Sequence, residues 1–161
     1  VGAGSTVFFT DSDRIGIGTL SARAKLDIEG HTRFKSYSEN VGALSVSGGD
    51  VSVDLSVAQS FTLTPNQAVT ALRLQNIPDD ASSFMVKVEQ GGSAYAVDLD
   101  KIHVGSGSTC IVKWPGGIVP TVTQVANKTD IYSFKIFDGA SLKSSPSTNV
   151  VYGIVGGQNF V

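Results

Sequence analysis

The chain has 161 residues, of which 41% are hydrophobic and only 16% are charged, and its formal net charge is −2. This length fits one domain of ~100–200 residues. The weak negative charge offers no basic footprint for nucleic acid or anionic lipid. No apolar run approaches the ~20 residues of a transmembrane helix. We therefore expect no nucleic-acid partner and no membrane insertion.

The start of the chain is not that of a newly synthesised protein. Val1 stands where Met would begin a complete reading frame, and no signal peptide follows it. We expect a fragment or a processed product that other modules precede in a longer protein.

Residues 1–40 carry large apolar residues only in short bursts, such as Val7-Phe8-Phe9. A segment below about 40 residues rarely buries enough surface on its own. We therefore expect an extended shaft or neck that forms the oligomer, with subunit contacts at Phe8, Phe9, Ile15 and Ile17. Two helical turns over residues 21–29, between a Ser21 cap and Gly30, are the alternative.

From Val41 onward, apolar and polar residues alternate in short runs that Gly, Pro, Asn and Asp separate. Val51 and Val53 alternate with serine and aspartate, and Phe84 and Val86 alternate in the same way. Short strands at this spacing predict an all-β fold, with an antiparallel β-sandwich or jelly-roll-like head at residues 41–161. No helical stripe and no repeat of 20–50 residues follows residue 40.

Residues 130–139 give the clearest strand signal in the chain. Tyr132, Phe134 and Ile136 alternate onto one face of such a strand, and Phe137 falls on the other face. Because both faces carry apolar groups, the pattern predicts a central strand of the sheet.

The sequence offers no familiar metal site and no cofactor motif. His31 and His103 lie far apart, and with a single cysteine they cannot build a zinc site. Asp11-Ser12-Asp13 imitates the opening of a calcium loop, but Ile15 occupies a ligand position and Ala22 stands where the bidentate Glu belongs. We expect no metal and no cofactor.

Catalysis is not expected either. Asp50 with Asp54, and Asp98 with Asp100, are spaced to share a strand face. Paired carboxylates can do acid–base work on sugars, but solvated charges on strand faces are much commoner. The scattered carboxylates therefore predict no enzyme site.

Cys110 and Trp114 are each expected in the core. Cys110 is the only cysteine, so an intrachain disulfide is impossible. Its apolar neighbours and the lack of a basic cluster favour a buried thiol over a reactive one. Trp114 precedes Pro115-Gly116-Gly117 and is interpreted as a core or interface aromatic, with an exposed binding platform as the alternative.

Two stretches resemble segments of bacteriophage appendage proteins. Asp13-Arg14-Ile15-Gly16-Ile17-Gly18-Thr19, followed by Ala24-Lys25-Leu26-Asp27-Ile28, resembles a segment common in tail fibres that usually precedes a C-terminal domain. A second series is similar to the C-terminal domain of tail-fibre or fibre-like structural proteins. It comprises Val112-Lys113-Trp114-Pro115-Gly116-Gly117, Lys128-Thr129-Asp130, Phe137-Asp138-Gly139 and Val151-Tyr152-Gly153-Ile154-Val155-Gly156-Gly157-Gln158-Asn159-Phe160.

The resemblance implies a virion structural protein that forms a homotrimer, joins other virion proteins upstream and works outside the cell when it engages the host. Distal domains of such proteins contact a host surface glycan or protein, so we expect host attachment through the loops of the head. A purely structural fibre or decoration protein without a receptor is the main alternative. A glycan-degrading tailspike is a further one, which would need carboxylates clustered in a groove.

The receptor contacts are expected on one set of loops. If the strands from Val69 onward alternate in direction, their connections fall into two sets at opposite ends of the head. The first set is 76–82, 101–108 and 127–129, and the second is 91–94, 115–120 and 140–148. We expect the first set to face the host, because its polar groups can hydrogen-bond a surface glycan; ordinary solvated turns are the alternative. The candidate contact residues are Asp79, Asp80, Lys101, His103 and Asn127.

Overall fold

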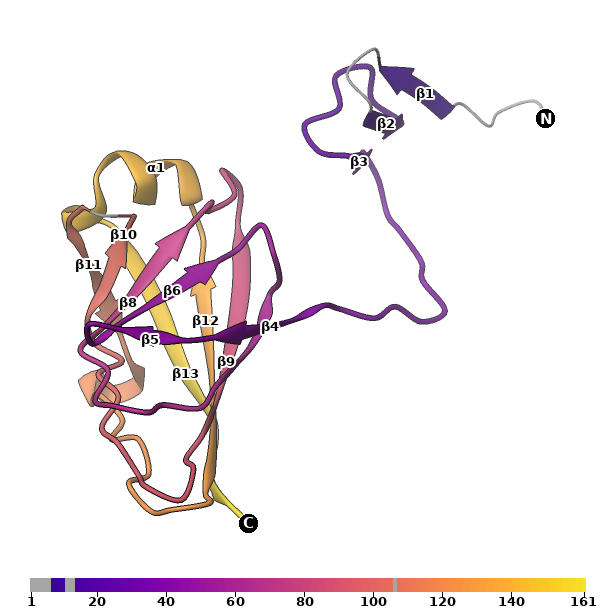
Figure 1. Ribbon diagram of the computed structural model, residues 1–161. Coiled ribbons are helices and arrows are strands. Elements are labelled where there is room, and N and C mark those ends of the chain that lie inside the picture. Colours follow the sequence, from indigo (N-terminus) through magenta and orange to yellow (C-terminus); the bar gives the residue numbers. More distant parts are fainter. Residues whose placement is uncertain (1–6, 11–13, 106) are drawn as a thin grey trace. The chain divides into compact units, whose positions relative to one another are not determined.

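The computed structural model describes residues 7–10, 14–105 and 107–161, with the side chains of all of these except 7–10 (Figure 1). The chain forms two compact units, Val1–Ser38 and Glu39–Val161. Asp11 to Asp13, which imitate a calcium loop, lie outside the described residues.

The first unit contains a small sheet of three strands in the order β1-β2-β3. These are β1 (Val7–Thr10), β2 (Arg14–Ile17) and β3 (Leu26–Ile28). Two helical turns over residues 21–29 were the alternative to extended structure, and Leu26–Ile28 is a strand that pairs with β2. Extended structure is therefore confirmed at these three residues. Gly16 is required because a Cβ atom there would lie 2.5 Å from the carbonyl oxygen of Thr19.

This small sheet does not bury its own apolar side chains. Ile15 and Ile17 are each 36% exposed, and Leu26 is 51% exposed. Phe8 and Phe9 lie on β1, whose side chains the structure does not describe. The subunit contacts predicted at Phe8, Phe9, Ile15 and Ile17 therefore stay a prediction.

The second unit is built mainly from strands, which confirms the all-β class. Its strands are β4 (Val41–Leu44), β5 (Val46–Ser47), β6 (Asp50–Asp54), β7 (Ser60–Leu63), β8 (Ala71–Gln75), β9 (Ser82–Glu89), β10 (Ile102–Val104), β11 (Thr109–Lys113), β12 (Thr129–Ile136) and β13 (Val150–Phe160). Its helices are the short α1 (Gly139–Ser144) and the 3-10 turns η1 (Pro115–Gly117) and η2 (Pro146–Thr148).

All ten strands belong to one sheet, nearly closed into a barrel, in the order β4-β7-β9-β12-β13-β11-β10-β8-β6-β5. The predicted antiparallel pairing is wrong for five of its nine ladders: β4/β7, β7/β9, β6/β8, β8/β10 and β11/β13 are parallel. Most neighbours in this sheet are distant in the chain. Apolar alternation in a sequence reports which face a strand buries, but not the direction of the strand beside it.

Strand β12 is central, as its sequence predicts, and lies between β9 and β13. Tyr132, Phe134 and Ile136 are at most 1% exposed. The rings of Phe134 and Phe84 stack with centroids 4.8 Å apart, and Trp114 packs edge-on to Phe134 at 5.6 Å. The core position predicted for Trp114 is therefore confirmed.

Cys110 is also in the core, as expected, with 4% of its surface exposed. Burial raises the pKa of its thiol to about 11. A thiol with this pKa is almost wholly protonated near neutral pH, which agrees with the interpretation as an unreactive apolar residue.

A buried carboxylate ties three segments of the head together. Asp130 is 1% exposed, and its Oδ2 accepts hydrogen bonds from the Thr123 N–H at 2.6 Å and the Tyr132 hydroxyl at 2.9 Å. Its Oδ1 accepts from the Asn159 N–H at 2.8 Å, and Gln158 Nε2 lies 3.4 Å from Oδ2. Burial raises the pKa of Asp130, but the hydrogen bonds from Thr123, Asn159 and Tyr132 outweigh it, so the pKa is lowered overall.

Two local predictions are wrong. The stretch 140–148, expected as a loop, contains α1, which Asp138 caps by accepting a hydrogen bond from the Ser141 N–H. A helix of six residues has fewer than two turns and shows no apolar stripe in sequence. Asp98 and Asp100 share no strand face, because they lie in a turn where the Asp100 N–H donates to the Asp98 carboxylate at 3.0 Å.

Candidate functional site

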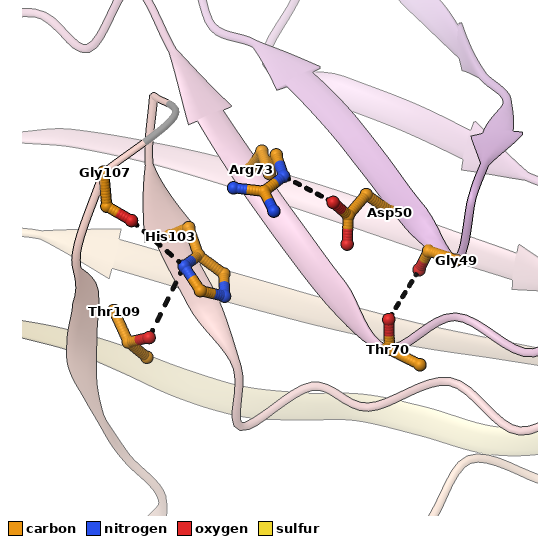
Figure 2. A network of polar contacts seen from close by, with 7 residues as sticks. All are labelled: Gly49, Asp50, Thr70, Arg73, His103, Gly107 and Thr109. Atoms are coloured by element: carbon orange, nitrogen blue, oxygen red, sulfur yellow. Dashed lines mark hydrogen bonds and ion pairs between the residues drawn. The ribbon is translucent and has the colours of Figure 1, made fainter.

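A row of polar side chains crosses the outward faces of β6, β8, β10 and β11 (Figure 2). Arg73 pairs in register with Ser52 on one side and with His103 on the other, and His103 pairs with Thr109. Residues opposite one another on neighbouring strands point to the same face, so the register places these groups side by side. We call Asp50, Ser52, Arg73, His103 and Thr109 the polar outer patch.

The local sequence fixes which face these groups occupy. Leu72 and Leu74, on either side of Arg73, are at most 1% exposed, and Val51 and Val53 of β6 are fully buried. Because side chains alternate along a strand, burial of these neighbours turns the polar residues between them outward.

An ion pair holds Arg73 in place on this face. Its Nε donates to Oδ2 of Asp50 at 2.6 Å, and the two side chains are 31% and 32% exposed. Both Nη groups are left without a hydrogen bond to any residue whose side chain the structure describes. Arg73 therefore presents donors at a fixed position on the outer surface.

His103 is also held by its neighbours in the row. Its Nδ1 lies 3.3 Å from the carbonyl oxygen of Gly107 and 3.4 Å from Oγ1 of Thr109. Donation to the carbonyl requires the tautomer with the proton on Nδ1. In that tautomer Nε2 accepts, whereas Nε2 donates in the other tautomer, where Nδ1 accepts from the Thr109 hydroxyl. The row therefore offers donors at Arg73 and a second hydrogen-bonding nitrogen at His103.

Asp54 lies on the same face of β6 as Asp50, but it has partners of its own. Asn76 Nδ2 lies 3.0 Å from both of its carboxylate oxygens, and the Ser56 hydroxyl donates at 2.7 Å. The hydrogen bonds from the Ser56 hydroxyl, the Asn76 amide and the Ser56 N–H lower the pKa of Asp54. Asp50 and Asp54 are therefore held by separate partners, Arg73 for Asp50 and Asn76 with Ser56 for Asp54.

A hollow of about 460 Å³ adjoins the row at the ends of β8 and β10. Its lining residues are Leu74, Gln75, Asn76, Ile77, Val104, Gly105 and Lys143. Lys143 comes from α1 and forms an ion pair with Asp79. None of the five patch residues lines the hollow, so it lies beside the polar outer patch and next to the loop that carries Asp79 and Asp80.

The structure does not bring the five predicted contact residues together. Ser82 begins β9 opposite Ile136, and Glu89 ends it opposite Thr129. Asp79 and Asp80 precede β9, whereas Asn127 precedes Thr129 at the far end of the same eight-residue strand. Of the five, only His103 belongs to the polar outer patch, whereas Asp79 reaches the neighbouring hollow through its ion pair with Lys143.

Lys101 and Asn127 lie at the other end of the head. Lys101 pairs with Asp98 at 3.5 Å and lines a second hollow of about 410 Å³, with residues 119–122 and 124 on its opposite wall. The Asn127 N–H donates to the carbonyl oxygens of Gln90 and Gly91, and Asn127 itself adopts a positive φ of 60°, as its turn chemistry favours.

The predicted division of the loops into two sets is therefore wrong. Stretch 140–148 follows β12 and lies at the same end as 76–82, whereas 127–129 lies with 91–94 at the opposite end. Figure 1 shows α1 at one end of this unit and the C-terminus at the other. Parallel ladders break the simple alternation of direction on which the division rested.

Sequence reasoning missed Arg73, Thr109 and Lys143. Arg73 carries a signal, since it is the charged residue at an outward position between Leu72 and Leu74. Its partners Asp50 and His103 lie more than twenty residues away on either side, so only the strand order brings them to it.

The described part of the chain was searched for metal-binding groups and for membrane-spanning helices. Residues 14–105 and 107–161 contain no group of three or more His, Cys, Asp or Glu placed to hold a metal ion. None of the helices described is long and apolar enough to span a membrane.

Comparison of the chain with protein-family models, with curated proteins and with solved structures gave no match.

Proposed function

We propose that the chain is the distal part of a bacteriophage tail fibre or similar virion appendage and attaches the virion to the host cell surface. The observation that carries the proposal is the polar outer patch, where Arg73 and His103 are fixed by neighbours and still offer hydrogen-bonding groups to the outside. The motifs at residues 13–28 and 112–160, which resemble fibre proteins, supply the virion context. The same proposal includes a homotrimer with a jelly-roll-like head on a short neck.

The chemistry of the patch fits a glycan. Sugar hydroxyls both donate and accept hydrogen bonds, and the Arg73 Nη groups, the Asp50 carboxylate and His103 Nε2 supply both kinds of partner. Arg73 is held by Asp50 before any ligand arrives, so little side-chain freedom is lost on binding. A flat row of this kind suits a weak single contact that several copies in one fibre reinforce.

The test is binding of the full chain to host cells and to a glycan array. Arg73→Gln and His103→Gln should each lower binding at least tenfold, because each removes one fixed partner of the ligand. Arg33→Gln is the matched control, since Arg33 is exposed on the first unit. Full binding by both patch variants, with circular dichroism unchanged, would refute the proposal.

The main rival is a structural virion part without a receptor. It predicts no binding to cells or glycans by the unaltered chain, so the same experiment separates the two. A glycan-degrading tailspike is disfavoured because Asp50 and Asp54 are each held by their own partners.

A further inference from the structure

The hollow of about 410 Å³ on the head is lined by none of the residues of the polar outer patch. Its size falls within the ~300–1,000 Å³ that is typical of ligand pockets. The buried residues that line it are Val69, Val97, Leu99 and Val122, each at most 7% exposed. We call the stretch 96–98 the first wall of this hollow and the stretch 119–124 its second wall.

The second wall is held in place by side chains instead of a neighbouring strand. Oδ2 of Asp130 accepts from the Thr123 N–H at 2.6 Å, and Gln90 Nε2 donates to the carbonyl oxygen of Thr123 at 3.0 Å. Gln158 Nε2 donates to the carbonyl oxygen of Thr121 at 2.7 Å. Backbone groups two residues apart are therefore bonded from one side, which is the period of an extended segment.

The other edge of the second wall has no partner. Val122 lies between Thr121 and Thr123, so its N–H and carbonyl oxygen point to the opposite side of the extended segment. Val122 lines the hollow, whereas Thr123 does not. Val122 is 3% exposed, and none of the described residues gives its two backbone groups a hydrogen bond. More than ~90% of buried backbone groups in native proteins are paired, so this edge is an exception that points to a missing partner.

The first wall shows the same feature at Val97, which forms an isolated parallel bridge with Val69. The Val69 N–H donates to the carbonyl oxygen of Ala96, and the Asp98 N–H donates to that of Val69, each at 2.9 Å. These bonds use the groups on either side of Val97, so its own N–H and carbonyl oxygen point away from Val69. Val97 is 7% exposed, and these two groups have no hydrogen bond to any described residue. Both walls thus carry a buried donor and acceptor without partners.

The lining also restricts the charge and the side chains of an occupant. Among the described residues that line the hollow, only Asp98 and Lys101 are charged, and they form an ion pair at 3.5 Å. The balanced charge favours an uncharged occupant. The buried valines and leucine suit a β-branched apolar side chain, and the exposed Thr121 and Gln124 suit polar side chains beside it.

We propose that this hollow binds an extended, uncharged peptide segment of a partner protein, in which β-branched apolar residues alternate with polar ones. Neighbouring residues of an extended peptide present their N–H and carbonyl groups to opposite sides, so one residue pairs with Val97 and the next with Val122. A glycan has hydroxyl groups but lacks these alternating pairs of donor and acceptor. In such strand addition, backbone hydrogen bonds give affinity and side-chain pockets give specificity. The proposal is independent of host attachment, because it uses other residues.

The probe is the synthetic pentapeptide acetyl-Thr-Val-Thr-Val-Thr-amide, titrated to millimolar concentration against the full chain labelled with nitrogen-15. The NMR signals of the Val97 and Val122 amides should shift, and exchange of both amide protons with solvent should slow at least tenfold. The signals of Ser52 and His103, in the polar outer patch, should stay in place. Peptides methylated on both valine nitrogens, or on the central threonine nitrogen, should each bind at least tenfold more weakly, because each loses its donors on one edge.

Substitutions in the chain supply a second arm of the test. Ala96→Trp, at an exposed position that lines the hollow, should lower the affinity for the peptide at least tenfold by filling the space, and Ala68→Trp is a second variant of the same kind. Ala81→Trp is the matched control, because Ala81 is exposed before β9 and does not line the hollow. Arg73→Gln, which tests host attachment, should leave peptide binding unchanged.

Three results would overturn the inference. Unshifted Val97 and Val122 signals at millimolar peptide would show that the hollow holds water only. Equal affinity of the methylated peptides would show that backbone hydrogen bonds do not hold the ligand. Full affinity of both tryptophan variants, with circular dichroism of folded protein, would place the peptide elsewhere.

Discussion

Asp130 should be among the residues on which the stability of the head depends most strongly. Its carboxylate accepts hydrogen bonds from Thr123, Tyr132 and Asn159, which belong to a loop, the central strand and the C-terminal strand. Asp130→Asn keeps the shape but turns one oxygen into an amide donor. If that amide replaces Oδ2, it faces the Thr123 N–H, so two donors oppose each other in a buried site.

Asp130→Asn should lower the free energy of unfolding by about 2–4 kcal/mol, because each buried donor left without an acceptor costs ~1–3 kcal/mol.

The pH dependence of this stability difference is a second, independent test of the role of Asp130. The pKa of Asp130 is lowered in the folded protein, so its contribution is present above the unfolded value of ~3.9 and is lost as pH falls through the lower folded value. The stability difference between the original chain and Asp130→Asn should therefore be constant near neutral pH and shrink below about pH 4.

Urea unfolding followed by circular dichroism, at equal chain concentrations between pH 7 and pH 2.5, measures this difference. Asp138→Asn is the matched control. Asp138 is exposed and caps α1, and asparagine caps a helix about as well as aspartate, so its effect should stay within ~0.5 kcal/mol. A cost below 1 kcal/mol for Asp130→Asn, or a difference that does not change with pH, would refute the reasoning.

Two further predictions concern the core and the absence of catalysis. Phe134→Ala should lower the free energy of unfolding by about 3–5 kcal/mol through lost transfer energy and a cavity. Phe34→Ala, at a side chain 64% exposed, should change the free energy of unfolding by no more than ~0.5 kcal/mol. Equal melting temperatures for the two variants would contradict the placement of the central strand. The full chain should release no reducing ends from host polysaccharide, with or without a chelator of divalent ions, and release that Asp54→Asn abolishes would show that the head is an enzyme.

Much of the core could be predicted from the sequence because its signals are local. The alternation in β12 and the apolar setting of Cys110 depend on neighbouring residues, and the structure places both in the core. Trp114 is similar, since the turn Pro115-Gly116-Gly117 marks the end of its strand. The six-residue α1 was missed because it is too short to show a stripe.

The candidate site could not be predicted in the same way. Whether His103 lies beside Arg73 or beside Asn127 depends on strand order and direction, which long-range pairing decides. The loop grouping failed at this step because it assumed that each strand reverses the one before it. Asp79 and Lys143 meet for the same reason, although 64 residues separate them.

The position of the C-terminal strand has a consequence for how the head is made. β13 joins β12 to β11, so the group β4-β7-β9-β12 and the group β11-β10-β8-β6-β5 share no ladder without it (β13 is yellow in Figure 1). During synthesis the chain emerges from its N-terminal side first, so β13 is made after every other strand of this sheet. A chain that terminates before Val150 cannot complete the sheet, so the two groups of strands stay without a common ladder until β13 has been made.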